Sequence, residues 1–365
     1  MKILHTVENY FPTICGVQEV VQRLSEGLAQ RGHEVTVATT YHPDRELNYL
    51  NGVKIEQFDI SGKWTKGFKG TTKKYKEFLL ENDFNLMMNY AALQWSTDLT
   101  FALLQKLKYK KVLIPCGYST LYNWKWKPYY WMLPAVLRKY DHIIYHCENY
   151  RDKPFGDKFN IINYSIIPNG VSEAEFNKPC IGFKKEFNIK EEKMFLCVSN
   201  YGTGKNQEFV VKAFQEANIK NSILVLIGSK FNEYSEYITK KVINIKNSTK
   251  VILLEKIPRD TIVTALFEAD LFLFGSILEY FPLVILEAMA SGTPFISTDV
   301  GCVRSLPGGE EVTSIREMRE AIINLSSNKI FWQQLAQDGR KAYEDKYKWE
   351  KIIDKYENLY LSLLR

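Results

Sequence analysis

Two glutamates in the second half of the chain have the residue type and the spacing to bind a ligand rich in hydroxyl groups. Glu279 and Glu287 lie eight positions apart, and Glu287 is the only charged residue between Phe281 and Thr298. A buried carboxylate without a partner is costly, so the protein or a ligand must supply hydrogen-bond donors to it. Sugar hydroxyls are one source, and donors inside the protein, in a purely structural role, are the alternative.

The residues between the two glutamates predict a helix start that can hold a phosphate. Pro282 stands at the expected first helical position, and Gly292 stands at the expected C-terminal cap. Phe281, Leu283 and Val284 then offer backbone N–H groups at the positive end of the helix dipole. The segment therefore predicts a binding site for a diphosphate.

This segment resembles a known donor-binding signature. Residues 269–301, ADLFLFGSILEYFPLVILEAMASGTPFISTDVG, resemble the signature of retaining GT-B glycosyltransferases of family 4 (glycosyl transferases group 1), including the paired glutamates. The resemblance implies that Glu279 is catalytic and approaches the transferred sugar. It also implies that Glu287 binds the ribose hydroxyls of a nucleotide sugar and that the segment 281–284 holds the diphosphate.

Four more stretches resemble the same family, so the resemblance covers most of the chain. They are ILHTVENYFPTICGVQEVVQRLSEGLAQRGHEVTV, IIPNGVSEAEF, VSNYGTGKNQEFVVKAF and the C-terminal WEKIIDKYENLYLSLL. In such proteins the terminal helix commonly crosses back to the first domain. We expect the same of the amphipathic segment after Trp349.

Two loops match the family's donor site in part. In the loop PTICG, residues 12–16, the family has two adjacent glycines, of which Gly16 remains while Cys15 replaces the other. A glycine lets the backbone approach a phosphate or sugar closely, and a plain turn is the alternative. Lys205 matches a lysine that neutralises the diphosphate, a catalytic role, unless it is an ordinary exposed lysine. Asn200 replaces a donor-binding arginine and supplies no charge.

The sugar-binding position after the strand KVLIP also departs from the family pattern. Cys116 and Gly117 stand where many relatives have a histidine, which bonds the donor sugar, followed by glycine. A thiol is a weak donor. We therefore expect altered contacts, compensation by Tyr118, or a buried structural role for Cys116.

Aromatic residues are concentrated just after this strand. Seven of the fourteen residues from Tyr118 to Trp131 are aromatic, and two lysines are interleaved with them. Rings such as Trp124 and Trp126 suit an acceptor platform that stacks on sugars. They also suit a patch that contacts an anionic membrane, with attraction from the lysines between Lys63 and Lys76. Packing in the core is a third account of these rings.

The elements that position these residues alternate along the whole chain. Strand-like runs lie at 3–7, 34–39, 86–90, 112–115 and 142–145, with a helical stretch at 17–30, and again at 194–199, 223–227, 251–254, 271–274 and 294–298. Right-handed crossovers then predict an α/β protein with two Rossmann-like, doubly wound parallel sheets. Ligands bind beyond the carboxyl ends of such strands, so we expect two domains that face each other across a cleft.

A linker divides the two series of strands. The turn pair Asn169-Gly170 is followed by residues without regular periodicity, and 365 residues exceed the size at which one core stops growing. We predict an N-terminal acceptor-binding domain over residues 1–170 and a C-terminal donor-binding domain over 171–348. The final helix, 349–365, is expected to return to the first domain.

The composition, with 45% hydrophobic and 25% charged residues, is that of a globular protein. The cysteines show no disulfide pattern, and neither a signal segment nor a spanning apolar run is visible. We therefore expect a cytoplasmic protein with at most peripheral contact at the inner face of the cell membrane. The net charge of +6 arises within residues 1–170, which hold 22 Lys/Arg and 16 Asp/Glu. This excess predicts either an anionic partner or a solvated basic surface.

Together these features predict a retaining, hexosyl-type glycosyltransferase. It would move a sugar from a nucleoside diphosphate sugar to a hydroxyl of a glycan or lipid-linked acceptor, as in surface-polysaccharide biosynthesis. We expect no metal and no other cofactor, since no metal-ligand spacing is visible and Lys205 with helix amides can stabilise the diphosphate. No nucleic acid partner is expected. Two alternatives remain: a nucleotide-sugar epimerase of similar fold, and a non-catalytic nucleotide-sugar binding protein, which the departures at Cys15, Cys116 and Asn200 favour.

Overall fold

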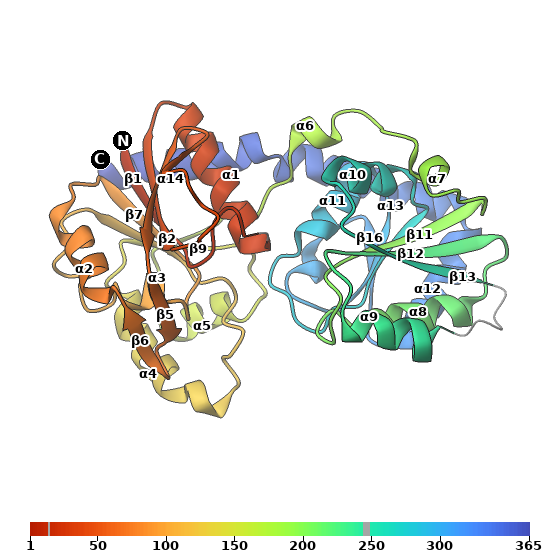
Figure 1. Cartoon of the computed structure of the whole chain (residues 1–365), viewed down its shortest axis with the longest axis horizontal. Helices are drawn as coiled ribbons and strands as arrows, with labels where there is room; N and C mark the ends of the chain where they lie inside the picture. The colour runs from red at the N-terminus through yellow and green to blue at the C-terminus, as the bar shows by residue number, and fades with distance from the viewer. Residues whose placement is uncertain (14, 244–248) are drawn as a thin grey trace. The chain divides into compact units, whose positions relative to one another are not determined.

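The computed structural model describes residues 1–13, 15–243 and 249–365. The chain divides into two compact units (Figure 1): the first consists of Met1–Asn169 together with Trp349–Arg365, and the second of Gly170–Lys348. The chain therefore passes between the units twice. At the start and end of the second unit, the two passages are joined by a hydrogen bond of 2.7 Å from the Val171 N–H to the Tyr347 carbonyl.

The first unit is built on a mostly parallel sheet. Its described strands are ordered β10-β9-β8-β7-β1-β2-β4-β3, and the neighbouring pairs are parallel except for β3–β4. The strand order reverses at β1, because β2 pairs with one edge of β1 and β7 with the other. The strands are β1 (Lys2–Thr6), β2 (Glu34–Thr40), β3 (Tyr49–Leu50), β4 (Val53–Phe58), β7 (Leu86–Tyr90), β8 (Lys110–Ile114), β9 (His142–Tyr145) and β10 (Tyr164–Ile166).

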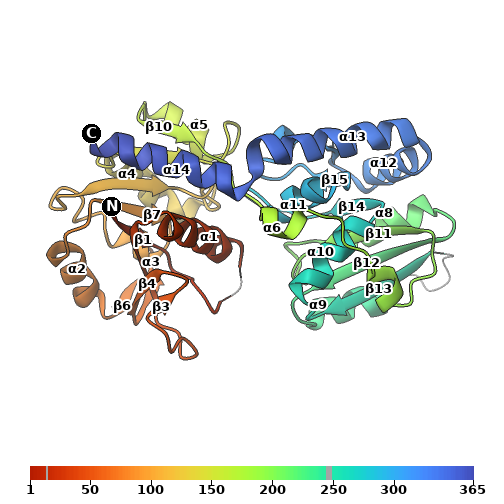
Figure 2. The ribbon, with the colours of Figure 1, turned by 90° about the horizontal axis from the view of Figure 1, so that it is seen from above.

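Helices cover both faces of this sheet. They are α1 (Gly16–Gln30), α2 (Thr72–Glu81), α3 (Trp95–Asp98), α4 (Lys127–Leu137), α5 (Asp152–Lys158) and α14 (Trp349–Leu364), with a 3-10 turn η1 (Trp124–Trp126) before α4. Leu4 of β1 belongs to the core that α2 and α4 cover, whereas the next residue, His5, contacts Ser25 of α1 and Tyr360 of α14. α14 lies beside α1 (Figure 2). The first unit thus includes the last helix of the chain.

The second unit is built on a parallel sheet. Its described strands are ordered β13-β12-β11-β14-β15-β16, and the order reverses between β11 and β14. The strands are β11 (Lys193–Val198), β12 (Ser222–Gly228), β13 (Lys250–Glu255), β14 (Leu271–Phe274), β15 (Phe295–Thr298) and β16 (Gly309–Val312). Each unit therefore has one point where two loops diverge from adjacent strand ends, the usual place for a ligand in such sheets.

Helices on both faces of this second sheet complete the unit (Figure 1). They are α6 (Glu173–Phe176), α7 (Phe183–Glu186), α8 (Gln207–Ala217), α9 (Glu233–Tyr237), α10 (Arg259–Glu268), α11 (Leu283–Ser291), α12 (Ile315–Ser327) and α13 (Lys329–Ala342), with short turns η2 (Ile238–Val242), η3 (Val303–Ser305) and η4 (Tyr343–Tyr347). α8 packs against α12, and α10 packs against α11. The loops that follow β11 and β14 lie at the carboxyl ends of these two strands.

The doubly wound parallel architecture predicted from the sequence is confirmed, and the strands predicted at 86–90, 142–145 and 271–274 have the predicted bounds. The antiparallel hairpin of β5 (Ile60–Lys63) and β6 (Gly67–Gly70) was not predicted, because glycines and lysines interrupt its apolar pattern. Strand β16 was also missed, since two of its four residues are glutamates at the edge of the sheet. Within the described part of the chain, no helix is both long and apolar enough to cross a membrane.

Candidate functional site

Two loops of the second unit meet where its strand order reverses. The loop from β11 to α8 carries Lys205, and the loop from β14 to α11 carries Glu279. The Lys205 ammonium forms an ion pair with the Glu279 carboxylate, and the Ser276 hydroxyl donates to the same carboxylate oxygen at 2.9 Å. A backbone bond of 2.9 Å from the Ile277 N–H to the Gly204 carbonyl also joins the loops. The fold thus brings together the two residues that the sequence predicts to be catalytic.

Glycines allow the loop that carries Glu279 to pack closely. A Cβ on Gly275 would lie 2.9 Å from the Asn206 carbonyl oxygen. One on Gly301, whose φ is +59°, would lie 2.2 Å from the carbonyl oxygen of Tyr280. Backbone cannot yield to such contacts without a shift of the loop, so glycine at both positions permits the conformation of the loop that carries Glu279.

The helix start after Glu279 differs by one position from the prediction. Pro282 is the N-cap residue, with φ −69° and ψ 114°, and Leu283 is the first helical residue. Gly292 caps the other end in the left-handed conformation, as predicted. The backbone N–H groups of Leu283 and Val284 therefore occupy the first turn, where a helix has no carbonyl of its own to satisfy them. Phe281 is buried, with its ring centroid 6.3 Å from that of Tyr347.

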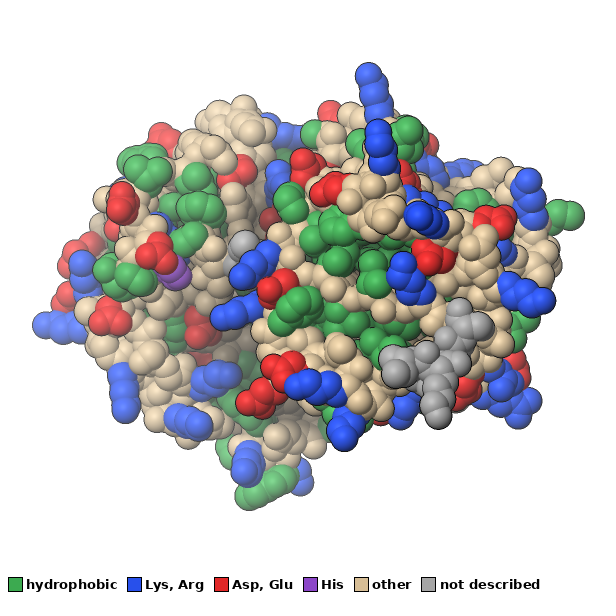
Figure 3. All heavy atoms as spheres, turned by 45° about the vertical axis from the view of Figure 1, so that its right-hand side comes forward, with side chains coloured by type: hydrophobic (Ala, Val, Ile, Leu, Met, Phe, Trp, Pro, Cys, Tyr) green, Lys and Arg blue, Asp and Glu red, His purple; other side chains and the backbone are tan. Residues whose placement is uncertain are grey.

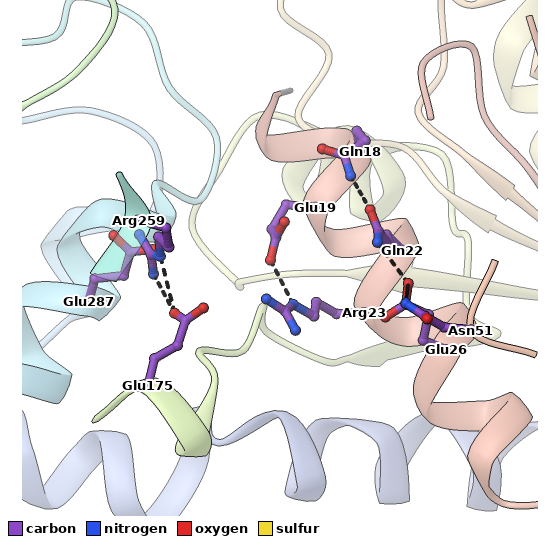
Figure 4. Close-up of polar contacts among 9 residues, drawn as sticks. All are labelled: Gln18, Glu19, Gln22, Arg23, Glu26, Asn51, Glu175, Arg259 and Glu287. Carbon is purple, nitrogen blue, oxygen red and sulfur yellow. Dashed lines mark hydrogen bonds and ion pairs between the residues drawn. The ribbon is translucent and has the colours of Figure 1, made fainter. Parts of the chain in front are cut away.

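Glu287 has a protein partner that the sequence analysis missed. Its Oε1 accepts from Arg259 of α10 at 2.7 Å, and the same guanidinium nitrogen donates to Glu175 of α6 at 2.7 Å (Figure 4). Burial by itself would lower the pKa of Arg259, but the two carboxylates outweigh it and the net pKa is raised. Of the two sources of donors that the sequence left open for Glu287, the structure shows one inside the protein, the Arg259 guanidinium.

Asn200 and Cys15, which depart from the family pattern, lie in different environments. Asn200 is exposed beyond the end of β11, and its carbonyl accepts from Gln207 at 3.0 Å. Cys15 caps α1, its Sγ accepting from the Gln18 N–H at 3.5 Å. A Cβ on Gly16 would meet no described atom within 4 Å, so local packing does not demand glycine there. Ile14, in the same loop, lies outside the described residues.

The first unit has a pocket of about 360 Å³ at its own reversal of strand order. It is lined by Glu8, Asn9, Lys63, Ala92, Leu93, Gln94, Ser119, Thr120 and Trp126. Most of these residues follow the carboxyl ends of β1, β7 and β8, and the Glu8 N–H donates to the Gln94 side chain at 3.0 Å across two of the loops. Carboxylate, amide, hydroxyl and indole groups in one concave site are suited to a polyhydroxylated ligand.

Two carboxyl groups at this pocket were not singled out from the sequence. Burial raises the pKa of Glu8, and the Lys63 ammonium partly opposes the rise. Burial also raises the pKa of Asp98 to about 7, against the hydrogen bond of 2.8 Å that the Tyr129 hydroxyl donates to it. Tyr129 in turn accepts from the N–H of Leu93, a residue of the pocket wall, at 3.3 Å. Asp98 therefore lies directly behind the pocket.

Backbone strain is concentrated around the same pocket. Ala91 and Leu93 after β7 both have φ of +67°, and Cys116 and Tyr118 after β8 have φ of +61° and +46°. Residues with a Cβ rarely adopt this conformation, and where they do the surrounding structure holds them there, often at a binding site. At the second loop, the Asp152 carboxylate supplies one such restraint, because it accepts from the Gly117 N–H at 3.0 Å.

The residues predicted to bind an acceptor or sugar are divided among three environments. The Tyr118 ring is buried against Tyr130 and Phe155, with centroids 5.6 and 5.3 Å away, so packing in the core accounts for it. Burial raises the pKa of the partly buried Cys116 thiol to about 12, so it stays protonated at neutral pH. Trp126 lines the pocket, and Trp124 is exposed. Gly117 is buried.

Two family models match most of the chain between them. The model of glycosyltransferase family 4 matches residues 14–175, and the model of glycosyl transferases group 1 matches residues 182–342. The chain belongs to glycosyltransferase family 4. The second unit's loops of this family-4 protein lie within the matched residues, as does the first unit's pocket apart from Glu8 and Asn9. Among the residues that the structure describes, no three His, Cys, Asp or Glu side chains are grouped as metal ligands would be.

Relatives of this family-4 chain carry several names. It is 29% identical over 197 residues to the N-acetyl-alpha-D-glucosaminyl L-malate synthase of Bacillus anthracis, a match that covers 52% of the chain and 51% of that relative. It is 24% identical to the alpha-monoglucosyldiacylglycerol synthase of Streptococcus pneumoniae, covering 81% of the chain and 71% of the relative. The first match thus spans about half of the relative's length, and neither fixes a substrate for this chain.

Solved structures show the same GT-B fold. The sucrose-phosphate synthase from Thermosynechococcus elongatus superposes with a TM-score of 0.81 at 18% identity, covering 99% of this chain and 98% of that one. The Anabaena HepE protein, in complex with UDP and glucose, superposes with a TM-score of 0.77 at 14% identity, covering 99% and 100%. At such identities the likeness establishes the fold of the family-4 chain, and its ligands must be argued from its own residues.

Proposed function

We propose that this family-4 glycosyltransferase transfers a sugar, with retention at the anomeric carbon, from a nucleoside diphosphate sugar to a hydroxyl of a lipid-linked or surface-polysaccharide glycan. The observation that carries the proposal is the meeting of Lys205, Glu279 and the start of α11 at the reversal point of the second sheet. Strand ends at such a point are where open parallel sheets bind their ligands. The donor would therefore bind to the second unit.

Each part of the donor finds a suitable group in these loops. The N–H groups of Leu283 and Val284, at the positive end of α11, suit the diphosphate. Lys205 adds a positive charge beside them, which favours the charge that builds up as the diphosphate leaves. Glu287, oriented by Arg259, would accept from ribose hydroxyls. These groups stabilise a leaving diphosphate without a bound metal, and we propose that transfer is metal-independent.

The pocket of the first unit suits the acceptor. Its lining provides the Glu8 carboxyl, the Asn9 and Gln94 amides, and an indole face at Trp126. Amides and carboxylates bond hydroxyls, and aromatic faces stack on sugar rings. Relatives named for a glucosyldiacylglycerol product and for diphosphoundecaprenol support an acceptor in which a sugar or hydroxyl is joined to a lipid.

The proposed transfer needs no separate protein base. The bond between the anomeric carbon and the diphosphate oxygen breaks, and a bond forms between that carbon and the acceptor oxygen on the same face of the sugar. The acceptor proton passes to the departing diphosphate oxygen, so charge and atoms balance. Glu279 would lie beside the transferred sugar, held by Ser276 and Lys205.

The test is donor binding and turnover of the intact chain against a panel of nucleoside diphosphate sugars. Glu287→Ala is expected to weaken binding of the selected donor about 10- to 100-fold, because a hydrogen bond to a charged group is lost. Calorimetry measures this change, with Glu233→Ala, an exposed glutamate of the same unit, as the matched control. Unchanged affinity in Glu287→Ala contradicts the assignment of the donor site.

Turnover separates the proposal from its two rivals. A transferase releases nucleoside diphosphate in proportion to glycosylated acceptor, and its product keeps the anomeric configuration of the donor, which nuclear magnetic resonance reads. An epimerase returns a changed nucleotide sugar without nucleotide release, and a binding protein shows affinity without any product. Loss of turnover on treatment with a chelator would contradict metal independence.

A further inference from the structure

The exposed face of one amphipathic segment in the first unit is aromatic and basic. Along η1 and α4, the residues Trp124, Lys127, Trp131 and Arg138 are spaced by three, four and seven positions and are all exposed. Such spacing places them in one stripe along the helix. The opposite face carries Tyr129, Leu133 and other members of the core. Packing within the unit therefore accounts for the inner rings and leaves the outer ones unexplained.

The outer rings are among the most exposed aromatic side chains of the first unit. Tyr122 is 79% exposed, Trp124 72% and Trp131 76%. Cations lie over two of them: the Lys125 ammonium is 5.8 Å from the Trp124 ring, and the Arg151 guanidinium is 5.3 Å from the Tyr122 ring. Large apolar groups gathered on a surface mark an interaction site. The cationic side chains among them favour a partner with negative charge.

The surrounding sequence adds positive charge without compensation. Residues 118–140 contain four Lys/Arg and no Asp/Glu, and residues 60–76 contain six lysines and no acid. The hairpin of β5 and β6 belongs to the second stretch and contacts the start of α4, where the Trp64 and Tyr129 ring centroids are 5.7 Å apart. Figure 3 shows basic and hydrophobic side chains near one another at the lower left of the view.

We propose that this docking surface, formed by Tyr122, Trp124, Lys125, Lys127 and Trp131 with the hairpin lysines Lys63 and Lys66, binds the face of an anionic lipid bilayer. Indole and phenol rings have an apolar body and a polar edge that suit the headgroup region. Lysines beside them are attracted to anionic headgroups. A water-soluble polyanion would use the lysines and leave the projecting rings without a role.

The docking surface adjoins the pocket of the first unit, which suggests how a lipid-linked acceptor would reach the pocket. Lys63 belongs to both, and Trp126, between Trp124 and Lys127, lines the pocket. A lipid-linked acceptor could thus place its headgroup in the pocket while its chains stay in the bilayer. This link rests on the proposed function, whereas binding to the bilayer does not, since it needs neither donor nor acceptor.

Co-sedimentation of the full chain with vesicles tests the proposal. The chain is expected to bind vesicles of phosphatidylglycerol mixed with phosphatidylcholine, to bind phosphatidylcholine alone weakly, and to be released by salt. The double variants Trp124→Ser/Trp131→Ser and Lys125→Glu/Lys127→Glu are each expected to weaken binding about tenfold or more. Circular dichroism shows whether each variant keeps its fold.

Matched controls lie elsewhere on the same unit. Lys106→Glu/Lys108→Glu makes the same charge change at two exposed lysines just before the amino end of β8. Tyr49→Ser removes an exposed ring from β3. Both should bind vesicles as the parent does. Equal losses in control and test variants would overturn the proposal, because general charge attraction would then explain the binding. Binding to soluble dextran sulfate without binding to anionic vesicles would also overturn it.

Discussion

The charges of Lys205 and Glu279 largely neutralise each other before any donor arrives. A diphosphate that reaches Lys205 gains attraction from the lysine and repulsion from the glutamate, and the N–H groups of α11 must supply the difference. The ion pair also fixes both side chains in advance, which lowers the cost of ordering them on binding. In the proposed donor site, Lys205 would thus act as a positive charge that is already in place beside the leaving diphosphate.

Lys205→Ala should therefore affect turnover more than folding. We expect kcat to fall about 100-fold, as when one donor to a developing negative charge is removed. Initial rates at saturating donor measure this change. Lys212→Ala is the control, since Lys212 is exposed on the next helix and pairs with Glu208 at the surface. An unchanged kcat in Lys205→Ala would remove this residue from the catalytic site.

Asp98 gives the first unit a pH-dependent stability. Its pKa rises from 3.8 to about 7 on folding because of burial. The folded state therefore holds a proton that the unfolded state releases, so stability present below about pH 4 is lost as the pH rises to about 7. The slope is at most about 1.4 kcal/mol per pH unit.

Asp98→Asn should remove this dependence, because an amide keeps the hydrogen bond from Tyr129 and carries no proton to lose. Urea unfolding at pH 5, 6 and 7 measures it: the parent should lose stability relative to the variant at each step. Asp83→Asn, an exposed residue, serves as the control. Parallel curves for the parent and Asp98→Asn would show that Asp98 is ionised throughout.

Among the elements, α1 and α14 are in contact where Gly27 of α1 faces the Ile353 side chain of α14. A Cβ on Gly27 would lie 2.2 Å from the Ile353 Cδ1, so a side chain at position 27 would have to displace the Ile353 side chain. Charged residues flank this contact, with Arg31 bonded to Glu357 at 2.7 Å. The close approach of the helices buries His5 of β1 between them.

Gly27→Leu is expected to lower the free energy of unfolding by about 1–3 kcal/mol through overpacking. Ile353→Ala in the same chain should recover part of the loss by making room, although it costs some packing by itself. Chemical denaturation of the four chains of this cycle measures the coupling. Additive effects of the two substitutions would contradict the proposed steric contact.

At the scale of the whole molecule, the first unit is assembled from two distant parts of the chain. Its last helix comes after the entire second unit and contributes Ile352, Tyr356 and Tyr360, each at most 1% exposed, to the first unit's core. The second unit, by contrast, is one continuous segment. The two units should therefore respond differently to loss of the C-terminus.

Truncation after Lys348 is expected to raise amide hydrogen exchange in β1 and α1, because it exposes the apolar face that α14 covers. Exchange in β11 and β14 should stay as in the parent. Removal of only Leu364 and Arg365 is the control, since neither residue is buried. Equal exchange changes in both units would show that they unfold as one body.

The sequence by itself determined the features that depend on near neighbours in the chain. Apolar runs and turn residues gave the alternation of strands and helices, and Gly292 gave the end of α11, because backbone conformation responds to local residue type. The family resemblance of residues 269–301 then indicated the loop that we propose binds the donor. The bound of α11 was off by one residue at Pro282, where proline fits both the cap and the first turn.

Only the tertiary structure decided which distant groups meet. Strand order places the Lys205 loop against Glu279, α10 brings Arg259 to Glu287, and the first unit's reversal point forms a pocket with Glu8. It also separated the aromatic run, turning Tyr118 into the core and Trp124 to the surface. Such outcomes depend on crossovers between elements far apart in sequence, so neither periodicity nor spacing along the chain contains them.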